Sequence, residues 1–251
     1  MNQIVFITGA TSGIGKATAT KAAAAGFDII ITGRRQERLN ELAEQIRQQG
    51  VEVLPLHFDV RHPIEVEEAI HSLPEKWRNI SVLVNNAGLA VGVNPIQDGI
   101  LDDWERMIDT NIKGLLYITR AIAPLMIANQ NGHIINLGSI AGKEVYPGGN
   151  VYCATKHAVD ALSKAMRIDM LKHNIKVTNI APGMVETEFS LVRYKGNEEA
   201  AKNVYQGLTP LTNEDIADII LFAITRPAHV CLNDIVIMPT AQASSRDVNR
   251  Q

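Results

Sequence analysis

The chain has few of the residues that build disulfide-linked or metal-binding proteins. Only two cysteines, Cys153 and Cys231, occur among 251 residues, and they form neither a CxxC pair nor a metal-type cluster. The seven histidines are scattered without ligand spacing, so we expect no metal ion. This scarcity excludes a disulfide framework and fits a reducing compartment.

A large charge of one sign and long apolar runs are also absent. The formal net charge is −3 and no basic block occurs, so nothing indicates a nucleic-acid partner. No apolar run approaches about 18 residues, so we expect no membrane span. The amino-terminal end leads directly into an apolar strand pattern, without the regions of a signal peptide. We therefore expect a cytoplasmic protein.

What the chain does have is a regular alternation of strand and helix patterns. Short apolar runs predict strands at 3–7, 28–32, 51–56, 82–84, 133–137, 176–180 and 235–238. Helical spacing of apolar residues predicts helices at 16–25, 36–49, 63–73, 101–127, 150–173 and 213–225. The alternation is typical of an α/β fold, here a Rossmann-type, doubly wound, seven-stranded parallel sheet. The length suits a single domain over residues 1–251.

Two segments lack these patterns. Residues 185–208 form one long irregular insertion after the sixth expected strand. Open α/β sheets bind ligands at the carboxyl ends of their strands, so this insertion is a candidate substrate lid. The polar tail over 242–251 is expected to be loose.

Tyr152 and Lys156 stand one helical turn apart and share one face of the expected helix 150–173. A free phenol titrates near about 10, too high for proton transfer at neutral pH. A neighbouring ammonium favours the phenolate, so we expect Lys156 to lower the pKa of Tyr152. A phenol adjusted in this way can exchange a proton with an alcohol oxygen. The pair also occurs by chance on amphipathic helices, so other motifs must support this interpretation.

A glycine-rich turn, TGATSGIG over residues 8–15, joins the first expected strand to the first helix. Strand, glycine-rich turn and helix together form the setting of a dinucleotide-binding fingerprint. Glycines let the backbone approach a pyrophosphate, which then meets the N–H groups at the helix amino terminus. A tight connector is the alternative interpretation of the same turn.

The end of the second expected strand indicates which dinucleotide binds. NAD sites usually place an acidic residue there to bind the ribose 2′-hydroxyl. Here Gly33 occupies that place, and Arg34 and Arg35 follow it. Because a guanidinium suits a phosphate, the pattern favours NADP(H) over NAD(H). The alternative is a solvated basic helix start.

Further polar and breaker residues follow the later strands on the same side of the sheet. The segment Asn85 to Gly88 follows the fourth strand, Ser139 follows the fifth, and Pro182-Gly183 with Thr187 follows the sixth. Asn111 lies inside the long helix pattern, where asparagine is unfavourable, and Gly114 nearby predicts a local kink. Each residue has a plain structural role as an alternative, and their convergence on one edge favours a site.

Together these residues resemble the short-chain dehydrogenase/reductase family over nearly the whole chain. Within it, the segments 33–39, 148–152 and 227–230 resemble the subgroup of NADP-dependent 3-hydroxy acid dehydrogenases, also described as serine or allo-threonine dehydrogenases. The resemblance implies hydride transfer between NADP(H) and carbon 3 of a short hydroxy acid such as L-serine, L-allo-threonine or 3-hydroxypropanoate. It also implies a homo-oligomer, commonly a tetramer.

The resemblance also implies roles for individual residues. Tyr152 would exchange the proton, Lys156 would lower its pKa and bind the nicotinamide ribose, and Ser139 would hold the substrate oxygen. Asn111 would anchor a water that links Lys156 to solvent. The residues implied for cofactor binding are Gly9, Thr11, Ser12, Gly13, Ile14, Gly15, Arg34, Arg35, Asp59, Val60, Asn86, Ala87, Gly88, Tyr152, Lys156, Pro182, Gly183, Val185 and Thr187.

A hydroxy acid also needs a partner for its carboxylate. Arg193 and Lys195 lie in the expected lid, and Lys143 lies just after Ser139. Arginine suits bidentate recognition of a carboxylate, so we favour Arg193. All three could instead be solvated surface charges.

Two other functions remain open. A reductase of 3-oxoacyl thioesters or of bulkier carbonyls would use the same fold, although residues 233–238 depart from the Asp-Gly-Gly usual in the thioester reductases of this family. A non-catalytic NADP(H) sensor is the second alternative. It is disfavoured because Tyr152 and Lys156 are both present.

Overall fold

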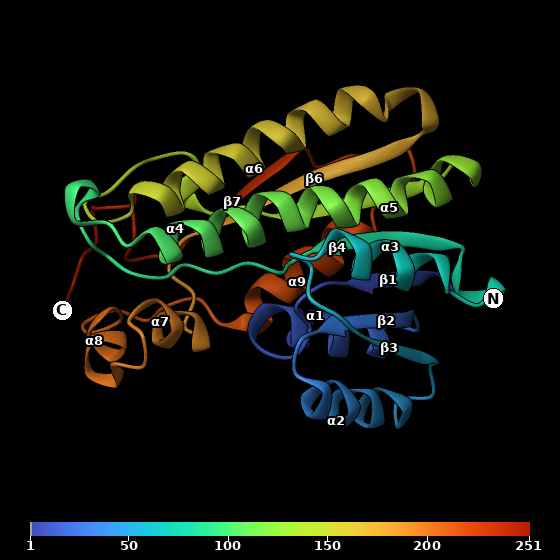
Figure 1. Ribbon diagram of the computed structural model, residues 1–251, viewed down its shortest axis with the longest axis horizontal. Helices are drawn as coiled ribbons and strands as arrows, with labels where there is room; N and C mark the ends of the chain where they lie inside the picture. Colours follow the sequence, from blue (N-terminus) through green and yellow to red (C-terminus); the bar gives the residue numbers. More distant parts are fainter. Residues whose placement is uncertain (1) are drawn as a thin grey trace.

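The computed structural model describes residues 2–251 and shows one parallel sheet between two layers of helices (Figure 1). The strands are β1 (Ile4–Ile7), β2 (Asp28–Gly33), β3 (Val53–His57), β4 (Ile80–Asn85), β5 (Gly132–Leu137), β6 (Ile175–Pro182) and β7 (Asp234–Ile237). Their order across the sheet is β3-β2-β1-β4-β5-β6-β7, and every pair is parallel. The predicted doubly wound fold is confirmed, with the strand order reversing between β1 and β4.

Helices cover both faces of the sheet. They are α1 (Gly13–Ala24), α2 (Gln36–Arg47), α3 (Pro63–His71), α4 (Leu101–Ile108), α5 (Leu115–Ala128), α6 (Asn150–Asp169), α7 (Glu188–Arg193), α8 (Glu198–Asn203) and α9 (Asn213–Ile224). Helices α1, α2 and α9 pack on one face, and α3, α5 and α6 pack on the other (Figure 1). None of the helices in residues 2–251 is both long and apolar enough to span a membrane.

The apolar strand runs exist because each strand is buried on both faces. In β1, Val5 and Ile7 belong to the core beneath α1, α2 and α9, whereas Phe6 belongs to the core beneath α3, α5 and α6. All three are fully buried. On α2, Leu39 and Leu42 are both buried in the first of these cores, as their helical spacing predicts. Burial on both faces is the physical reason why these strands do not alternate apolar and polar residues.

The long helix is not regular where the sequence predicts a kink. The helix is interrupted by a π-helical segment, η3 (Asp109–Gly114), between α4 and α5. Its Asn111 side chain accepts from Leu89 N at 2.9 Å and donates to Leu89 O at 2.8 Å. The side chain thus holds the loop after β4, and π-helical turns of this kind often mark functional sites.

The insertion over 185–208 is not irregular, so that expectation is wrong. It forms the two short helices α7 and α8, which lie together at one end of the molecule (Figure 1). Side-chain caps explain where α7 and α8 begin. Thr187 Oγ1 accepts from Phe189 N at the start of α7, and Asn197 Oδ1 accepts from Ala200 N at the start of α8. Such local capping bonds stabilise helices too short to show apolar periodicity.

The expectation of a loose carboxyl-terminal tail is also wrong. Gln242 is buried, and its Oε1 accepts from Met184 N at 2.8 Å. Ser245 N donates to Glu144 Oε2 at 2.7 Å, and Arg250 Nη2 donates to Val204 O at 3.0 Å. The polar tail therefore crosses the same end of the molecule as α7 and α8 and is fixed there by hydrogen bonds to several segments (Figure 1).

His133 in β5 gives the fold a pH dependence. Burial and, to a smaller extent, the nearby charge of Lys176 lower its pKa from 6.5 to about 3. Between pH 3 and pH 6.5 the imidazole of His133 is protonated in the unfolded chain and neutral in the folded chain. The free energy of unfolding therefore falls as pH falls below about 6.5. At pH 5 this loss amounts to about 2 kcal/mol.

We predict that His133→Asn loses less stability than the wild type between pH 7.5 and pH 5, as measured by urea unfolding. His71, exposed on α3, is the matched control, and His71→Asn should keep the wild-type dependence. Equal pH dependence in the His133→Asn and His71→Asn variants would show that His133 is not responsible.

Candidate active site

One large cavity opens at the carboxyl ends of the strands, where the sequence analysis expected the site. Its volume is about 960 Å³, near the upper end of small-molecule pockets, roughly 300–1,000 Å³. All the predicted site residues line it except Gly15, Asn111, Lys143 and Lys195. The topology explains the convergence, because the ends of parallel strands meet at one edge.

The glycine-rich turn leaves the start of α1 open to the cavity. Gly9 has φ +64° and Gly13 has φ +54°, the left-handed region that favours glycine. Gly15 lies behind the turn, and a Cβ there would come within 2.6 Å of Gly9 O. Asn86 Nδ2 binds the turn from β4 by donating to Thr8 O at 2.8 Å. Within residues 2–251 the N-cap residue of α1, Ser12, makes no side-chain capping bond, so the first N–H groups of the helix fit a pyrophosphate.

Beside this turn lies a cluster suited to a phosphate. Arg35 donates through Nε to Thr11 Oγ1 at 3.1 Å and through Nη2 to Ser12 Oγ at 2.7 Å. Arg34 is largely exposed, 3.8 Å from Asp59 Oδ2. A side chain at Gly33 would come within 2.7 Å of Thr11 Cγ2, so the acidic residue of an NAD site does not fit. This donor set fits a 2′-phosphate.

The wall beyond β3 and β4 fits an adenosine. Asp59 and Val60 line the cavity after β3, and Asn86, Ala87 and Gly88 line it after β4. Burial alone raises the pKa of Asp59, but hydrogen bonds from Arg61 lower it by more, so the carboxyl stays ionised.

Tyr152, Lys156 and Ser139 meet where α6 crosses the end of β5. Tyr152 is 9% exposed and Lys156 is 7% exposed, and both line the cavity. Lys156 Nζ donates to Leu137 O at 2.7 Å and lies 5.9 Å from the centroid of the Tyr152 ring. Ser139 caps the short turn η4 (Ile140–Gly142) by accepting from Ala141 N at 3.1 Å. The three residues predicted to act on the substrate therefore lie on the same wall of the cavity.

The expected lowering of the Tyr152 pKa by Lys156 is wrong for the protein alone. Burial raises the pKa of Tyr152 well above 10, Tyr146 adds to the rise, and Ser139 and Arg193 offset only part of it. Burial also lowers the pKa of Lys156 from 10.5 to about 8. The physical reason is that desolvation disfavours both charged forms, while the ammonium is directed at the Leu137 carbonyl.

Asn111 lies behind this wall rather than in the cavity. Besides binding Leu89, its Nδ2 donates to Thr155 Oγ1 at 3.0 Å. A Cβ on Gly88 would stand 3.3 Å from Asn111 Oδ1 and 3.6 Å from Lys156 Nζ. The amide thus joins η3, α6 and the loop after β4 next to Lys156.

Arg193, the last residue of α7, brings a cation to the other wall of the cavity. Its guanidinium carbon lies 5.8 Å from the Tyr152 ring centroid and 5.2 Å from that of Tyr146. Nη1 donates to Tyr146 Oη at 2.9 Å. Nε is buried and has no hydrogen-bond partner within residues 2–251. An anion held by this side chain would lie on the same side of the cavity as the Tyr152 ring.

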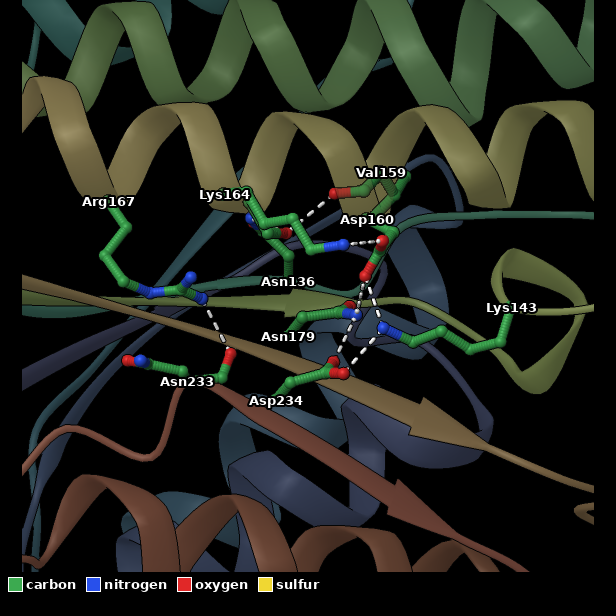
Figure 2. A network of polar contacts seen from close by, with 10 residues as sticks. Asn136, Lys143, Val159, Asp160, Lys164, Arg167, Asn179, Asn233 and Asp234 are labelled. Atoms are coloured by element: carbon green, nitrogen blue, oxygen red, sulfur yellow. Dashed lines mark hydrogen bonds and ion pairs between the residues drawn. The ribbon is translucent and has the colours of Figure 1, made fainter.

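The other two candidate carboxylate partners are used elsewhere. Lys195 pairs with Asp103 at 2.7 Å and does not line the cavity, which contradicts the expectation that it faces substrate. Figure 2 shows Lys143 reaching between Asp160 and Asp234, at 2.5 and 2.6 Å. In both cases a carboxylate of the fold already neutralises the ammonium, so neither lysine is available to a substrate.

Three neighbours of the site were missed by the sequence analysis. Glu188 accepts from both Arg35 and Arg38, and Tyr146 binds Arg193. Arg38 stands three residues after Arg35 on α2, a helical spacing that could have revealed it. Glu188 and Tyr146 carry no such signal, because the sequence does not predict the path of the segments that bring them to the site.

Within residues 2–251 no group of three or more His, Cys, Asp or Glu side chains could hold a metal ion. The polar groups on the walls are those suited to a dinucleotide and a small anion.

Comparisons with known proteins agree with this geometry. A family model described as short chain dehydrogenase matches residues 3–197. The chain is 49% identical over 246 residues to sulfoacetaldehyde reductase 2 of Chromohalobacter salexigens, covering 98% of this chain and 97% of the relative. It is 46% identical over 250 residues to the NADP-dependent 3-hydroxy acid dehydrogenase YdfG of Escherichia coli K12, covering 99% of this chain and all of the relative.

A solved structure, the closed form of serine dehydrogenase complexed with NADP+, superposes with a TM-score of 0.93 at 45% identity. The match covers 99% of this chain and 100% of that one. The family model and the relatives span most of this chain, and the strand-end motifs meet in one cavity. The protein therefore belongs to the short-chain dehydrogenase family of oxidoreductases.

Proposed function

We propose that this protein is an NADP(H)-dependent oxidoreductase that transfers a hydride to and from carbon 3 of short 3-hydroxy acids, such as L-serine, L-allo-threonine or 3-hydroxypropanoate. The observation that carries the proposal is the Arg193 guanidinium, which lies 5.8 Å from the Tyr152 ring with Nε unpartnered within residues 2–251. In a 3-hydroxy acid, one carbon separates the carbinol from the carboxylate. One substrate can therefore contact Tyr152 and Arg193 together.

The cofactor accepts or supplies the hydride, and the residues of the chain provide position and proton transfer. In the oxidising direction, the substrate hydroxyl gives its proton to the Tyr152 phenolate as the carbon–hydrogen bond breaks. Ser139 holds the substrate oxygen by a hydrogen bond, and Arg193 binds the carboxylate. Lys156 supplies positive charge beside the ribose and the phenol. Reduction of the matching ketone or semialdehyde uses the same groups in reverse.

We place the cofactor along the whole cavity. The pyrophosphate lies at the start of α1, and the 2′-phosphate lies at Arg35, with Arg34 beside it. Asp59 and Val60 bracket the adenine, and Asn86 to Gly88 border its ribose. The nicotinamide end lies against the wall that includes Pro182, Gly183, Val185 and Thr187. Support comes from the cavity lining and from a relative and a solved neighbour described with NADP.

We propose that Asn111 still anchors a water near Lys156, but through its backbone rather than its side chain. The three hydrogen bonds that its side chain makes are to Leu89 and Thr155. A water that links Lys156 to solvent would therefore bind the backbone carbonyl of Asn111. The π-helical turn supports this assignment, because it disturbs the regular hydrogen bonds of the helix.

A second substrate class is favoured by one relative. Sulfoacetaldehyde reductase 2 of Chromohalobacter salexigens is 49% identical, and its substrate carries a sulfonate. In sulfoacetaldehyde, as in a 3-oxo acid, one carbon separates the carbonyl from the anionic group. Comparing kcat/KM for 3-hydroxypropanoate, L-allo-threonine and 2-hydroxyethanesulfonate with NADP+ decides between the classes. Preference for a 3-hydroxybutyryl thioester, oxidised with NADP+ to the acetoacetyl thioester, over all three would contradict both.

We also propose a homo-oligomer, such as a tetramer, in the cytoplasm. Strand β7 lies at the edge of the sheet, where a second copy can pack, and its Val236 is 48% exposed. Phe222 on α9 is exposed to the same extent. Both cysteines are free thiols, as a reducing compartment allows.

We predict that Arg193→Met raises the KM for 3-hydroxypropanoate by about 10- to 100-fold, because a charged hydrogen bond to the carboxylate is lost. The KM for the uncharged alcohol 1-propanol should rise much less. Steady-state kinetics with NADP+ measures both. Lys202→Met, at an exposed position on α8 of the same lid, is the matched control and should not separate the two substrates. Equal changes for both substrates in Arg193→Met would rule out carboxylate recognition by Arg193.

We predict that Tyr152→Phe lowers kcat by about 100- to 10,000-fold and changes NADPH binding far less, because the proton-transfer oxygen is lost while most cofactor contacts remain. Tyr117→Phe, on α5 outside the site, is the control and should retain full turnover. Undiminished alcohol oxidation by Tyr152→Phe would refute the assignment.

The buried phenol makes a second measurement possible. In the free protein the pKa of Tyr152 is raised, so tyrosinate should form only above pH 10. A bound positive nicotinamide ring favours the phenolate, so NADP+ should lower this pKa while NADPH should not. Ultraviolet difference titration of wild type against Tyr152→Phe measures the shift. A smaller shift in Lys156→Met would show the contribution of the lysine.

A further inference from the structure

The lid reaches across the cavity to the arginines of the phosphate cluster. Glu188, the first residue of α7, accepts from Arg35 Nη1 at 3.1 Å through Oε2. Arg38 Nη1 donates to both carboxylate oxygens of Glu188, at 2.9 and 3.1 Å. Two guanidinium groups from the start of α2 thus meet on one carboxylate from the lid.

The remaining donors of Arg35 face the glycine-rich turn. Its Nε and Nη2 donate to Thr11 Oγ1 at 3.1 and 3.0 Å, and Nη2 also donates to Ser12 Oγ. Glu188 therefore binds the edge of Arg35 that the hydroxyl groups leave free. Because Arg35 and Glu188 both line the cavity, this edge is where an incoming anion would bind.

We propose that Glu188 determines cofactor affinity by competing with the 2′-phosphate for Arg35 and Arg38. The phosphate dianion displaces the carboxylate, and this exchange releases the amino-terminal end of α7 from α2. The inference rests on the proposed function, which places the 2′-phosphate at Arg35. A phosphate presents more charge and more acceptors to a guanidinium than a carboxylate does, and the two anions repel each other at one cation.

The ion pairs of Glu188 with Arg35 and Arg38 are weak enough for a phosphate to replace the carboxylate. Burial raises the pKa of Glu188, but hydrogen bonds from Arg35 and Arg38 lower it by more, so the group is a carboxylate at neutral pH. The three side chains are between 42% and 49% exposed. Exposed ion pairs are weak, so a bound dianion can replace this one.

Other attachments keep the lid in place when Glu188 is displaced. Gly92 N donates to Arg193 O at 3.0 Å, and Lys195 pairs with the buried Asp103 at 2.7 Å. Both lie at the carboxyl-terminal end of α7. The exchange therefore removes the contact between α7 and α2 and leaves Arg193 beside Tyr152.

The test measures the dissociation constants of adenosine 2′,5′-bisphosphate and 5′-AMP by calorimetry, which needs no turnover. We expect Glu188→Gln to bind the bisphosphate roughly 3- to 10-fold more tightly than the wild type, because the competing charge is gone. Binding of 5′-AMP should not change. Glu199→Gln, on exposed α8, is the matched control, since it removes the same charge from the same lid without touching an arginine.

Hydrogen exchange of the α7 amides gives a second readout. The bisphosphate should speed exchange over 188–193 in the wild type, whereas exchange in Glu188→Gln should be fast from the start. Unchanged or weaker bisphosphate binding by Glu188→Gln, in a protein that prefers the bisphosphate to 5′-AMP, would overturn the proposal, because Glu188 would then only orient Arg35. A wild type without that preference would overturn the placement of the 2′-phosphate itself.

Discussion

The hydrogen bond from Lys156 Nζ to Leu137 O, 2.7 Å long, holds the site together. It joins helix α6 to the end of strand β5 and places a buried ammonium beside the Tyr152 ring. The carbonyl carries only a partial charge, so the ammonium remains an uncompensated cation in a poorly hydrated place. Burial lowers its pKa to about 8 for that reason, and negative charge that develops on a neighbouring oxygen is favoured there.

The parallel sheet makes this arrangement possible. Its strands all end at one edge, so the glycine-rich turn, the loop after β4 and Ser139 meet although they are far apart in the chain. Asn86, in the loop after β4, holds the glycine-rich turn by donating to Thr8 O. Asn111 connects the same loop to α6 through its hydrogen bonds to Leu89 and Thr155. Polar side chains thus set the spacing of the strand ends while apolar layers support the sheet from both faces.

Charge separates the two ends of the cavity. Arginines gather at the end we assign to the adenosine phosphate, and Arg193 stands at the end we assign to the substrate. Helix α7 reaches both, through Glu188 at its start and Arg193 at its last residue. Lysines that could compete for an anionic substrate are neutralised by the fold, as Figure 2 shows for Lys143 between Asp160 and Asp234. The protein therefore presents positive charge to ligands at the two ends of the cavity.

The sequence by itself determined the sheet, the place where the long helix is interrupted and many of the residues around the cavity. Apolar runs, helical spacing and glycine turns depend on local physics, so residues such as Gly13, Asn111 and Tyr152 could be placed from residue type and spacing alone. The tertiary structure alone decided the ionisation of Tyr152, which depends on burial and on the direction of Lys156. It also decided that Arg193 faces the cavity while Lys195 faces Asp103, and that Glu188 meets Arg35. These outcomes depend on contacts between segments distant in the chain, and no local pattern encodes such distances.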